Sequence, residues 1–146
     1  MKDVQSRLPR KSIMASTGLS QSPTLRIIGG IIAFIPLGFG INALLRPRNA
    51  FEFFEFEVPA TPNEQRLVDN LMLFYGARDA FMAAALFVTA YYGNRKALGW
   101  LLIAAGAVAG VDGYAVNNQI GTGEWNHWGY APVITTLGAL LLGVLG

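Results

Sequence analysis

The chain has 146 residues, a length that suits one compact unit; 53% of them are hydrophobic and only 14% are charged. Soluble domains carry roughly 25% charged residues, so this composition, with its 17 glycines, favours closely packed membrane helices. The net charge of +2 is too small to indicate a nucleic-acid partner, and the absence of cysteine excludes disulfides, thiolate catalysis and cysteine-ligated metals.

The first segment, residues 1–24, is polar and basic, with serines, prolines and no apolar period. These features predict a mostly disordered N-terminal tail. Because the tail is basic and has a single acid, Asp3, a mitochondrial targeting peptide is an alternative interpretation. A cleaved secretory signal is disfavoured, since the first apolar run starts late and no small-residue cleavage site follows it.

Four apolar segments follow the tail. Each is close to the ~20 residues that a helix needs to cross ~30 Å of hydrocarbon. None presents the charged outer face that a helix of a soluble bundle needs. We therefore predict an all-α, integral membrane four-helix bundle over residues 25–146, with spans at about 27–45, 67–92, 97–117 and 128–146.

The connections between these spans differ in length. Residues 93–96 form a tight turn of Gly, Asn, Arg and Lys, which predicts an antiparallel hairpin of the second and third spans. The first connection is longer and contains FEFFEFE at 51–57. We interpret it either as a segment on the membrane surface, rings toward the lipid, or as a plain loop. Thr61 or Asn63 is the expected cap of the second helix.

The basic residues set the expected orientation. They gather in the N-terminal tail and in the turn at Arg95 and Lys96, which lie on one side of a membrane if there are four spans. The acidic residues lie mostly in the connections on the other side. The positive-inside rule then predicts that both termini are cytoplasmic.

Two charged residues lie deep in neighbouring spans. Arg78 is fourteen residues before Tyr92, and Asp112 is fifteen residues after Ala97. At ~1.5 Å per residue, both lie ~21–23 Å from the turn between these helices. An unpaired charge there costs at least ~2.5–3.5 kcal/mol. We therefore predict a bidentate pair between Arg78 and Asp112 inside the bundle.

Asp79 follows Arg78 directly, and its side chain is expected to point about 100° away around the helix. It should therefore pair with another donor, for which Asn42, Tyr114 and Tyr130 are the candidates. Small residues on the third span form one face, Gly106, Gly110, Gly113 and Asn117, which predicts close packing and draws Asp112 inward.

A polar and aromatic cluster near the third connection includes Asn117, His127 and Trp128. It predicts a polar outer end of the cavity, although interfacial tryptophans and a surface histidine explain the same pattern. His127 is the single histidine, which excludes a histidine-rich metal site. A site built from carboxylates alone has little support, so we predict no metal.

Three stretches carry a resemblance to a known group: GINALLRPRNAFEFF, YGARDAF and GVDGYAV. Across residues 27–146 the chain resembles the small four-span DoxX-like membrane proteins, and within them an uncharacterised family common in fungi. The resemblance implies a four-helix membrane bundle, in endomembranes if fungal or an inner membrane if bacterial. Some DoxX-like relatives are linked to quinone-coupled or sulfur redox chemistry, and the lack of cysteine argues against thiol-based versions here.

The buried charges support two hypotheses. In the first, the protein binds or transforms a lipophilic small molecule by cofactor-independent acid/base chemistry of the isomerase or cyclase type. Asp79 or Asp112 is the acid or base, Arg78 the anion-stabilising partner, and the candidate substrate-binding residues are Tyr75, Asn42, Tyr114, Asn117, His127 and Trp128.

In the second hypothesis, the protein is a structural or accessory membrane subunit. The Arg–Asp network then fixes helix packing, and the outer faces contact lipid, a membrane-protein partner or a second copy. A transporter is disfavoured, because four short spans without broken inverted repeats leave little room for alternating access.

Overall fold

The described residues, 18–144 of the computed structural model, fold into helices without a β-strand. A 3-10 turn, η1, opens this region, and seven α-helices follow. The bounds are η1 (Leu19–Gln21), α1 (Pro23–Ile32), α2 (Phe34–Leu45), α3 (Pro47–Glu52), α4 (Pro62–Tyr91), α5 (Arg95–Ile120), α6 (Trp125–Trp128) and α7 (Ala131–Leu142). The predicted all-α class is confirmed. Of the predicted tail, residues 1–17 lie outside the described residues, whereas residues 19–21 and 23–24 are helical.

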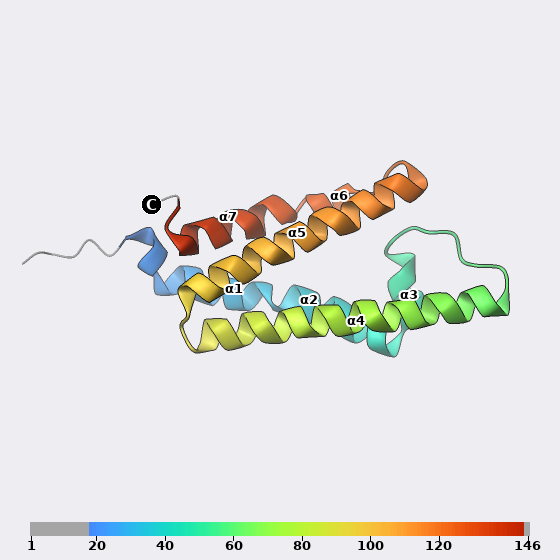
Figure 1. Ribbon diagram of the computed structural model, residues 1–146, viewed down its shortest axis with the longest axis horizontal. Coiled ribbons are helices and arrows are strands. Elements are labelled where there is room, and N and C mark those ends of the chain that lie inside the picture. The colour runs from blue at the N-terminus through green and yellow to red at the C-terminus, as the bar shows by residue number, and fades with distance from the viewer. Residues whose placement is uncertain (1–17, 145–146) are drawn as a thin grey trace, which may run out of the picture.

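The chain runs along the molecule four times (Figure 1). Helices α1 and α2 lead away from η1, α4 returns, α5 leads away again, and α6 and α7 return. The turn η1 packs beside α7, so the first and last described residues lie at the same end.

Within residues 18–144, three helical stretches are long and apolar enough to cross a membrane: Pro23–Leu45, Pro62–Tyr91 and Arg95–Ile120. They correspond to the first three predicted spans. Helix α7 has 12 residues, which at 1.5 Å per residue is about 18 Å. Crossing the hydrocarbon core takes ~20 residues. The fourth span at 128–146, and the cytoplasmic placement of the termini, therefore remain predictions.

Glycines let the helices pack as two close pairs, α2 with α4 and α5 with α7. A Cβ atom on Gly40 would lie 2.9 Å from the backbone nitrogen of Ala80 and 3.0 Å from the carbonyl oxygen of Gly76. In the other pair, a Cβ on Gly138 would lie 2.6 Å from the carbonyl oxygen of Gly99. Side chains at these crossings would force the backbones apart, as in other small-residue contacts of membrane helices.

The two pairs meet at the end of the α4–α5 turn and diverge toward the other end (Figure 1). The Asn94 side chain caps α5 by accepting from the backbone N–H of Ala97, and the predicted hairpin is confirmed. One apolar cluster fills the turn end: Ala33, Leu86, Leu98, Leu102, Leu137 and Leu141. A second fills the opposite end: Ala43, Ala50, Phe54, Met72 and Val116. The Arg78 and Asp112 level lies between them.

The first apolar stretch is interrupted at Ala33, between α1 and α2. Pro36 explains the break. Its ring has no N–H to donate to the carbonyl of Ile32, one turn earlier, and it crowds that carbonyl. Ile32 and Pro36 both line a cavity between the helix pairs.

The segment 51–57 is not a plain loop, and its position on a membrane surface stays a prediction. Helix α3 takes in Phe51 and Glu52, and a turn follows, in which Glu55 adopts a left-handed φ of 57°. Phe54 is buried in the second apolar cluster, and the three glutamates of the segment are exposed. Phe51, Phe54 and Phe56 therefore pack against protein, whereas Phe53 is 53% exposed. Thr61 caps α4 through a reciprocal capping box with Glu64, as expected for one of the two candidates.

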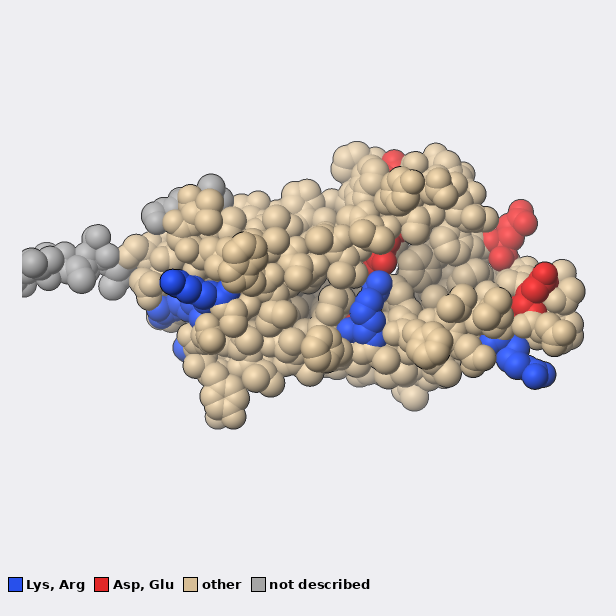
Figure 2. Space-filling view, in the orientation of Figure 1, with Lys and Arg blue, Asp and Glu red and all other residues tan. Residues whose placement is uncertain are grey.

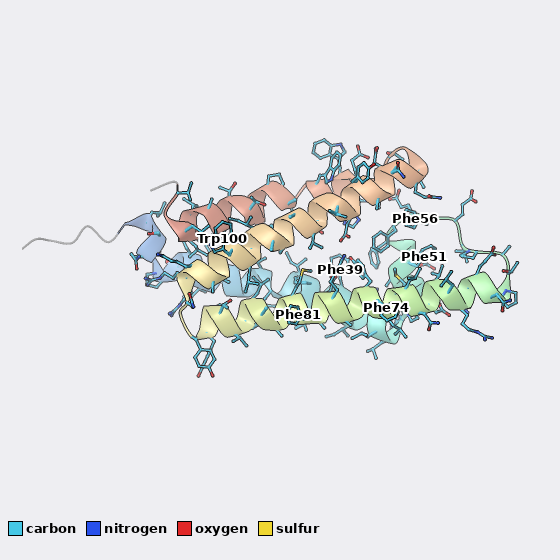
Figure 3. All side chains as sticks on the ribbon, viewed as in Figure 1. Phe39, Phe51, Phe56, Phe74, Phe81 and Trp100 are labelled. Carbon is cyan, nitrogen blue, oxygen red and sulfur yellow. The ribbon has the colours of Figure 1, made fainter. Side chains whose placement is uncertain are left out.

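Large apolar side chains also cover the outside of the helices. Phe74 and Phe81 of α4 are 73% and 72% exposed, and Trp100 of α5 is 63% exposed (Figure 3). Such continuous apolar exposure suits contact with a lipid bilayer. Outside the central cluster, acidic atoms lie at the end away from the α4–α5 turn, whereas basic atoms are seen at both ends (Figure 2).

Candidate functional site

The Arg78 guanidinium joins α4 to α5. Its two terminal nitrogens donate to the two carboxylate oxygens of Asp112, each over 3.0 Å. This is the planar, bidentate geometry that favours arginine over lysine. The pairing predicted from helix depth is confirmed. Acidic and basic atoms meet beside a hollow at the middle of the face in Figure 2.

Asp79 was expected to face away from Arg78, and that prediction is wrong. The Nε of Arg78 donates to Asp79 Oδ1 over 3.0 Å. The arginine side chain is long enough to fold back along its own helix to the next residue, which a backbone angle alone does not take into account. Asp79 is 3% exposed, so one guanidinium holds two carboxylates at the centre of the molecule.

Aromatic rings continue this cluster toward the diverging end of the helices. The Arg78 guanidinium lies 4.2 Å from the centroid of the Tyr75 ring, in cation–π range. Phe54 packs edge-on against Tyr75 with centroids 5.2 Å apart, and it stacks on His127 at 5.6 Å. The segment after α3 therefore bridges α4 and α6.

A narrow cavity of about 40 Å³ lies between the helix pairs, with Arg78, Asp79 and Asp112 in its wall. Tyr75 and Tyr130 add two hydroxyl-bearing rings. The rest of the wall is largely apolar, including Ile32, Ile35, Pro36, Met82, Ala109 and Ile134. The charged groups therefore face a mainly apolar space.

A second cavity of about 350 Å³ lies at the diverging end, and Phe39, Tyr75 and Tyr130 line both cavities. Its other lining residues come from the α3 region and from α6: Ala50, Glu52, Phe53, Phe54, Glu55, Asn126 and His127. Phe39 lies in the space between α4 and α5 (Figure 3). A volume of this size is within the usual range of small-molecule sites.

His127 is buried, at 8% exposed, and neither ring nitrogen has a hydrogen-bond partner. Burial lowers the pKa of His127 below its ordinary value; Asp112 opposes this shift and Arg78 reinforces it. The imidazole is therefore neutral at pH 7. The interpretation of His127 as a surface residue is wrong, because its ring is 8% exposed and stacks on Phe54.

The remaining candidate residues take different positions. Tyr114 is 64% exposed and lines neither cavity. Asn42 is half-buried and is not bonded to Asp79, and it also lines neither cavity. The Asn117 amide donates to Glu124 over 3.0 Å, and the Trp128 indole donates to the carbonyl of Gly110 over 3.1 Å. Asn117 and Trp128 therefore hold α6 and the residue before it against α5.

Sequence reasoning missed several lining residues of the second cavity, Phe39, Phe53, Phe54, Glu52 and Glu55 among them. The acidic and aromatic pattern of 51–57 was visible, but its folding into a turn against α4 and α6 was not. The glycine stripe on α5 packs against α6 and α7: Gly106 meets Thr135, and Gly113 meets Trp128. Asp112 consequently faces α4.

A comparison with protein families decides the affiliation of the chain. The family model described as "Domain of unknown function (DUF4267)" matches residues 33–141. The chain belongs to the DUF4267 family. No curated protein and no solved structure matches it.

The DUF4267 match runs from Ala33 into α7 and so includes every residue of the Arg78 cluster and every lining residue of both cavities except Ile32. The family description assigns no activity. The chemistry of the site must therefore be argued from its own side chains.

Proposed function

We propose that this DUF4267 protein binds a lipophilic small molecule between its two helix pairs and transforms it by acid/base chemistry of the isomerase or cyclase type. The observation that carries the proposal is the position of Arg78, Asp79 and Asp112 in the wall of a mainly apolar cavity. Charged residues inside a membrane protein are costly, and they usually mark ligand or proton sites.

The chemistry follows from the charge balance of the cluster. Two carboxylates share one guanidinium, so the three groups together can hold or release a proton. Asp79 is the proposed acid or base, because Asp112 is occupied by the bidentate pair. Arg78 would stabilise negative charge that develops on a carbonyl or enol oxygen of the ligand. Such a step consumes no oxidant or reductant.

The proposal includes an arrangement in the membrane. The first and last described residues lie at one end of the molecule, which supports four crossings, the fourth at about 128–146, and both termini on the cytoplasmic side. This arrangement agrees with the resemblance to the DoxX-like group, and it places the diverging end at the opposite membrane surface.

A pair of substitutions on α5 tests ligand binding. Ala105 lines the narrow cavity, and Ala104, its neighbour, is exposed on the outer face. Protein purified in detergent is extracted, and bound lipophilic compounds are identified by mass spectrometry. Ala105→Phe should lose the compounds that wild type retains, and Ala104→Phe should keep them. Equal retention by both variants would refute the binding proposal.

Asp79→Asn separates binding from conversion. The variant keeps the shape of the side chain but removes the acid, so it should retain the ligand and lose its isomerisation, followed by chromatography of the extracts. Asp112→Asn is the companion variant and should weaken the position of Arg78.

The alternative function is a structural or accessory subunit, and the bidentate Arg78–Asp112 pair is the observation that favours it. On this alternative the pair fixes the packing of α4 against α5. Asp79→Asn and Ala105→Phe would then leave the cellular phenotype of the protein unchanged, whereas Arg78→Leu would abolish folding.

A further inference from the structure

The second cavity has an unusual combination of walls. Six of its ten lining residues carry aromatic rings: Phe39, Phe53, Phe54, Tyr75, His127 and Tyr130. Two more, Glu52 and Glu55, are acidic, and among residues 18–144 no lysine or arginine lines it. Aromatic faces and carboxylates both attract positive charge, and neither attracts an anion.

From this combination we infer that the second cavity binds an organic cation of the alkylammonium class, such as a trimethylammonium head group. A quaternary ammonium cannot donate N–H bonds, so ring faces and nearby carboxylates are the groups that recognise it. Glu52 and Glu55 supply the carboxylates, both exposed at the rim of the cavity.

The rings are held in place by one another. Phe39 packs edge-on against Phe53 with centroids 5.7 Å apart, and Phe54 contacts both Tyr75 and His127. The protein already uses one of these rings for a cation, since the Arg78 guanidinium lies over Tyr75. A wall that is fixed before binding loses little conformational freedom when a ligand arrives.

His127 is a second and independent indication of a ligand site. It is more than nine-tenths buried in the wall of the cavity, and both ring nitrogens are unpartnered. Buried polar atoms usually have a partner. The trimethylammonium group cannot supply one, but the hydroxyl or ester oxygen next to it in a choline-type molecule can form a hydrogen bond with the imidazole. A neutral imidazole also adds no positive charge that would repel a cation.

The surrounding charge favours the same ligand. Arg78 is the cation of the central cluster, and Asp79 and Asp112 already offset it. Glu52 and Glu55 then add two further acidic groups. The Asn126 amide donates to Glu55 over 3.1 Å, which fixes that carboxylate between the α3 region and α6.

The inference of a head-group site depends on the second cavity alone. The placement of a tail rests on the proposed function, because an alkyl chain attached to the ammonium would extend past Tyr75 and Tyr130 into the narrow cavity. A lipid head group and a free soluble amine share the chemistry that the site recognises.

The test uses the full chain in maltoside micelles and isothermal titration with three probes. Choline and its uncharged tert-butyl isostere, dimethylbutanol, compare the head group with and without charge. Mixed micelles with phosphatidylcholine compare a lipid head group with the free amine. We expect choline or phosphatidylcholine to bind about tenfold more tightly than dimethylbutanol. Equal binding of choline, phosphatidylcholine and dimethylbutanol would overturn the inference.

Paired glutamate variants locate the site. Glu52→Gln combined with Glu55→Gln should weaken cation binding by about tenfold, whereas Glu57→Gln should not, since Glu57 is exposed nearby but does not line the cavity. If the double variant fails to fold, Glu52→Gln alone serves the same purpose. Unchanged affinity in the folded glutamate variant would refute the site. Ala105→Phe should leave choline binding intact, so failure of the proposed function is distinguished from failure of this inference.

Discussion

Arg78 and Asp112 are bonded across α4 and α5 at a level where these two helices have already moved apart from their shared turn. Each carboxylate oxygen receives one N–H, and the same guanidinium also reaches Asp79. One cation therefore stabilises one buried carboxylate, Asp79, and one partly buried carboxylate, Asp112, and its removal leaves both without their partner.

Arg78→Leu should destabilise the protein by about 3 kcal/mol. This value is at the lower end of the loss expected when one partner of a buried ion pair is removed, because the Arg78 side chain is about a third exposed. Thermal unfolding in detergent measures the effect. Arg48→Leu is the matched control: Arg48 pairs with Asp69 over 3.4 Å but is 68% exposed, so its loss should cost less than about 1 kcal/mol. Equal effects of the two variants would contradict the buried role of Arg78.

Gly76→Val should separate α2 from α4. A Cβ atom at Gly76 would lie 3.0 Å from the carbonyl oxygen of Gly40 and 2.9 Å from the side chain of Leu44. The loss should be about 1–3 kcal/mol or more, typical of overpacking. Gly110→Ala on α5 is the control, since a Cβ there meets nothing within 4 Å. That change should be neutral or stabilising, and a loss of stability equal to that of Gly76→Val would contradict the crossing.

His127→Phe should raise stability. The substitution keeps the stack on Phe54 and removes two buried nitrogens without partners, each of which costs about 1–3 kcal/mol. Thermal unfolding at about pH 8, where the imidazole is neutral in both the folded and unfolded chain, isolates this contribution. A destabilised variant would indicate that the nitrogens are bonded in the protein.

The same residue makes stability depend on pH. The pKa of His127 is lowered in the folded protein. As the pH falls, the imidazole of the unfolded chain is therefore protonated before that of the folded chain. Stability should therefore fall as the pH drops below about 6.5. His127→Phe should flatten this part of the unfolding profile, and Trp125→Phe, an exposed change in the same helix, should preserve it.

Thr61→Ala should cost about 1 kcal/mol by removing the cap of α4. The Thr61 hydroxyl accepts from the backbone of Glu64, and the Glu64 side chain returns the contact. Asn63 is an exposed residue two positions after Thr61, and Asn63→Ala should have a smaller effect on thermal unfolding. Similar losses in both variants would show that the capping box adds little.

The sequence was sufficient to place Arg78 opposite Asp112, because helical rise converts residue counts into depth and a tight turn fixes the register of two neighbouring helices. It was also sufficient for the Thr61 cap, which depends on residues three apart. Local rules of this kind need no knowledge of the rest of the fold.

Other parts depended on contacts between distant segments. Phe54 is buried because it meets α4 and α6, and nothing in FEFFEFE specifies those neighbours. The left-handed backbone of Glu55 is equally invisible in the sequence, since glycine and asparagine are the usual signals of that conformation. Most of the second cavity was missed for this reason.

The glycine crossings also have a mechanical consequence. Gly40 with Gly76, and Gly99 with Gly138, make each helix pair a stiff rod, whereas the two rods diverge from a common end. The deformation of the protein that costs least is a hinge motion, in which the angle between the two helix pairs changes. The Arg78–Asp112 ion pair joins the two helix pairs between the turn end and the diverging end. Its strength therefore limits how far the diverging ends of the helix pairs can separate.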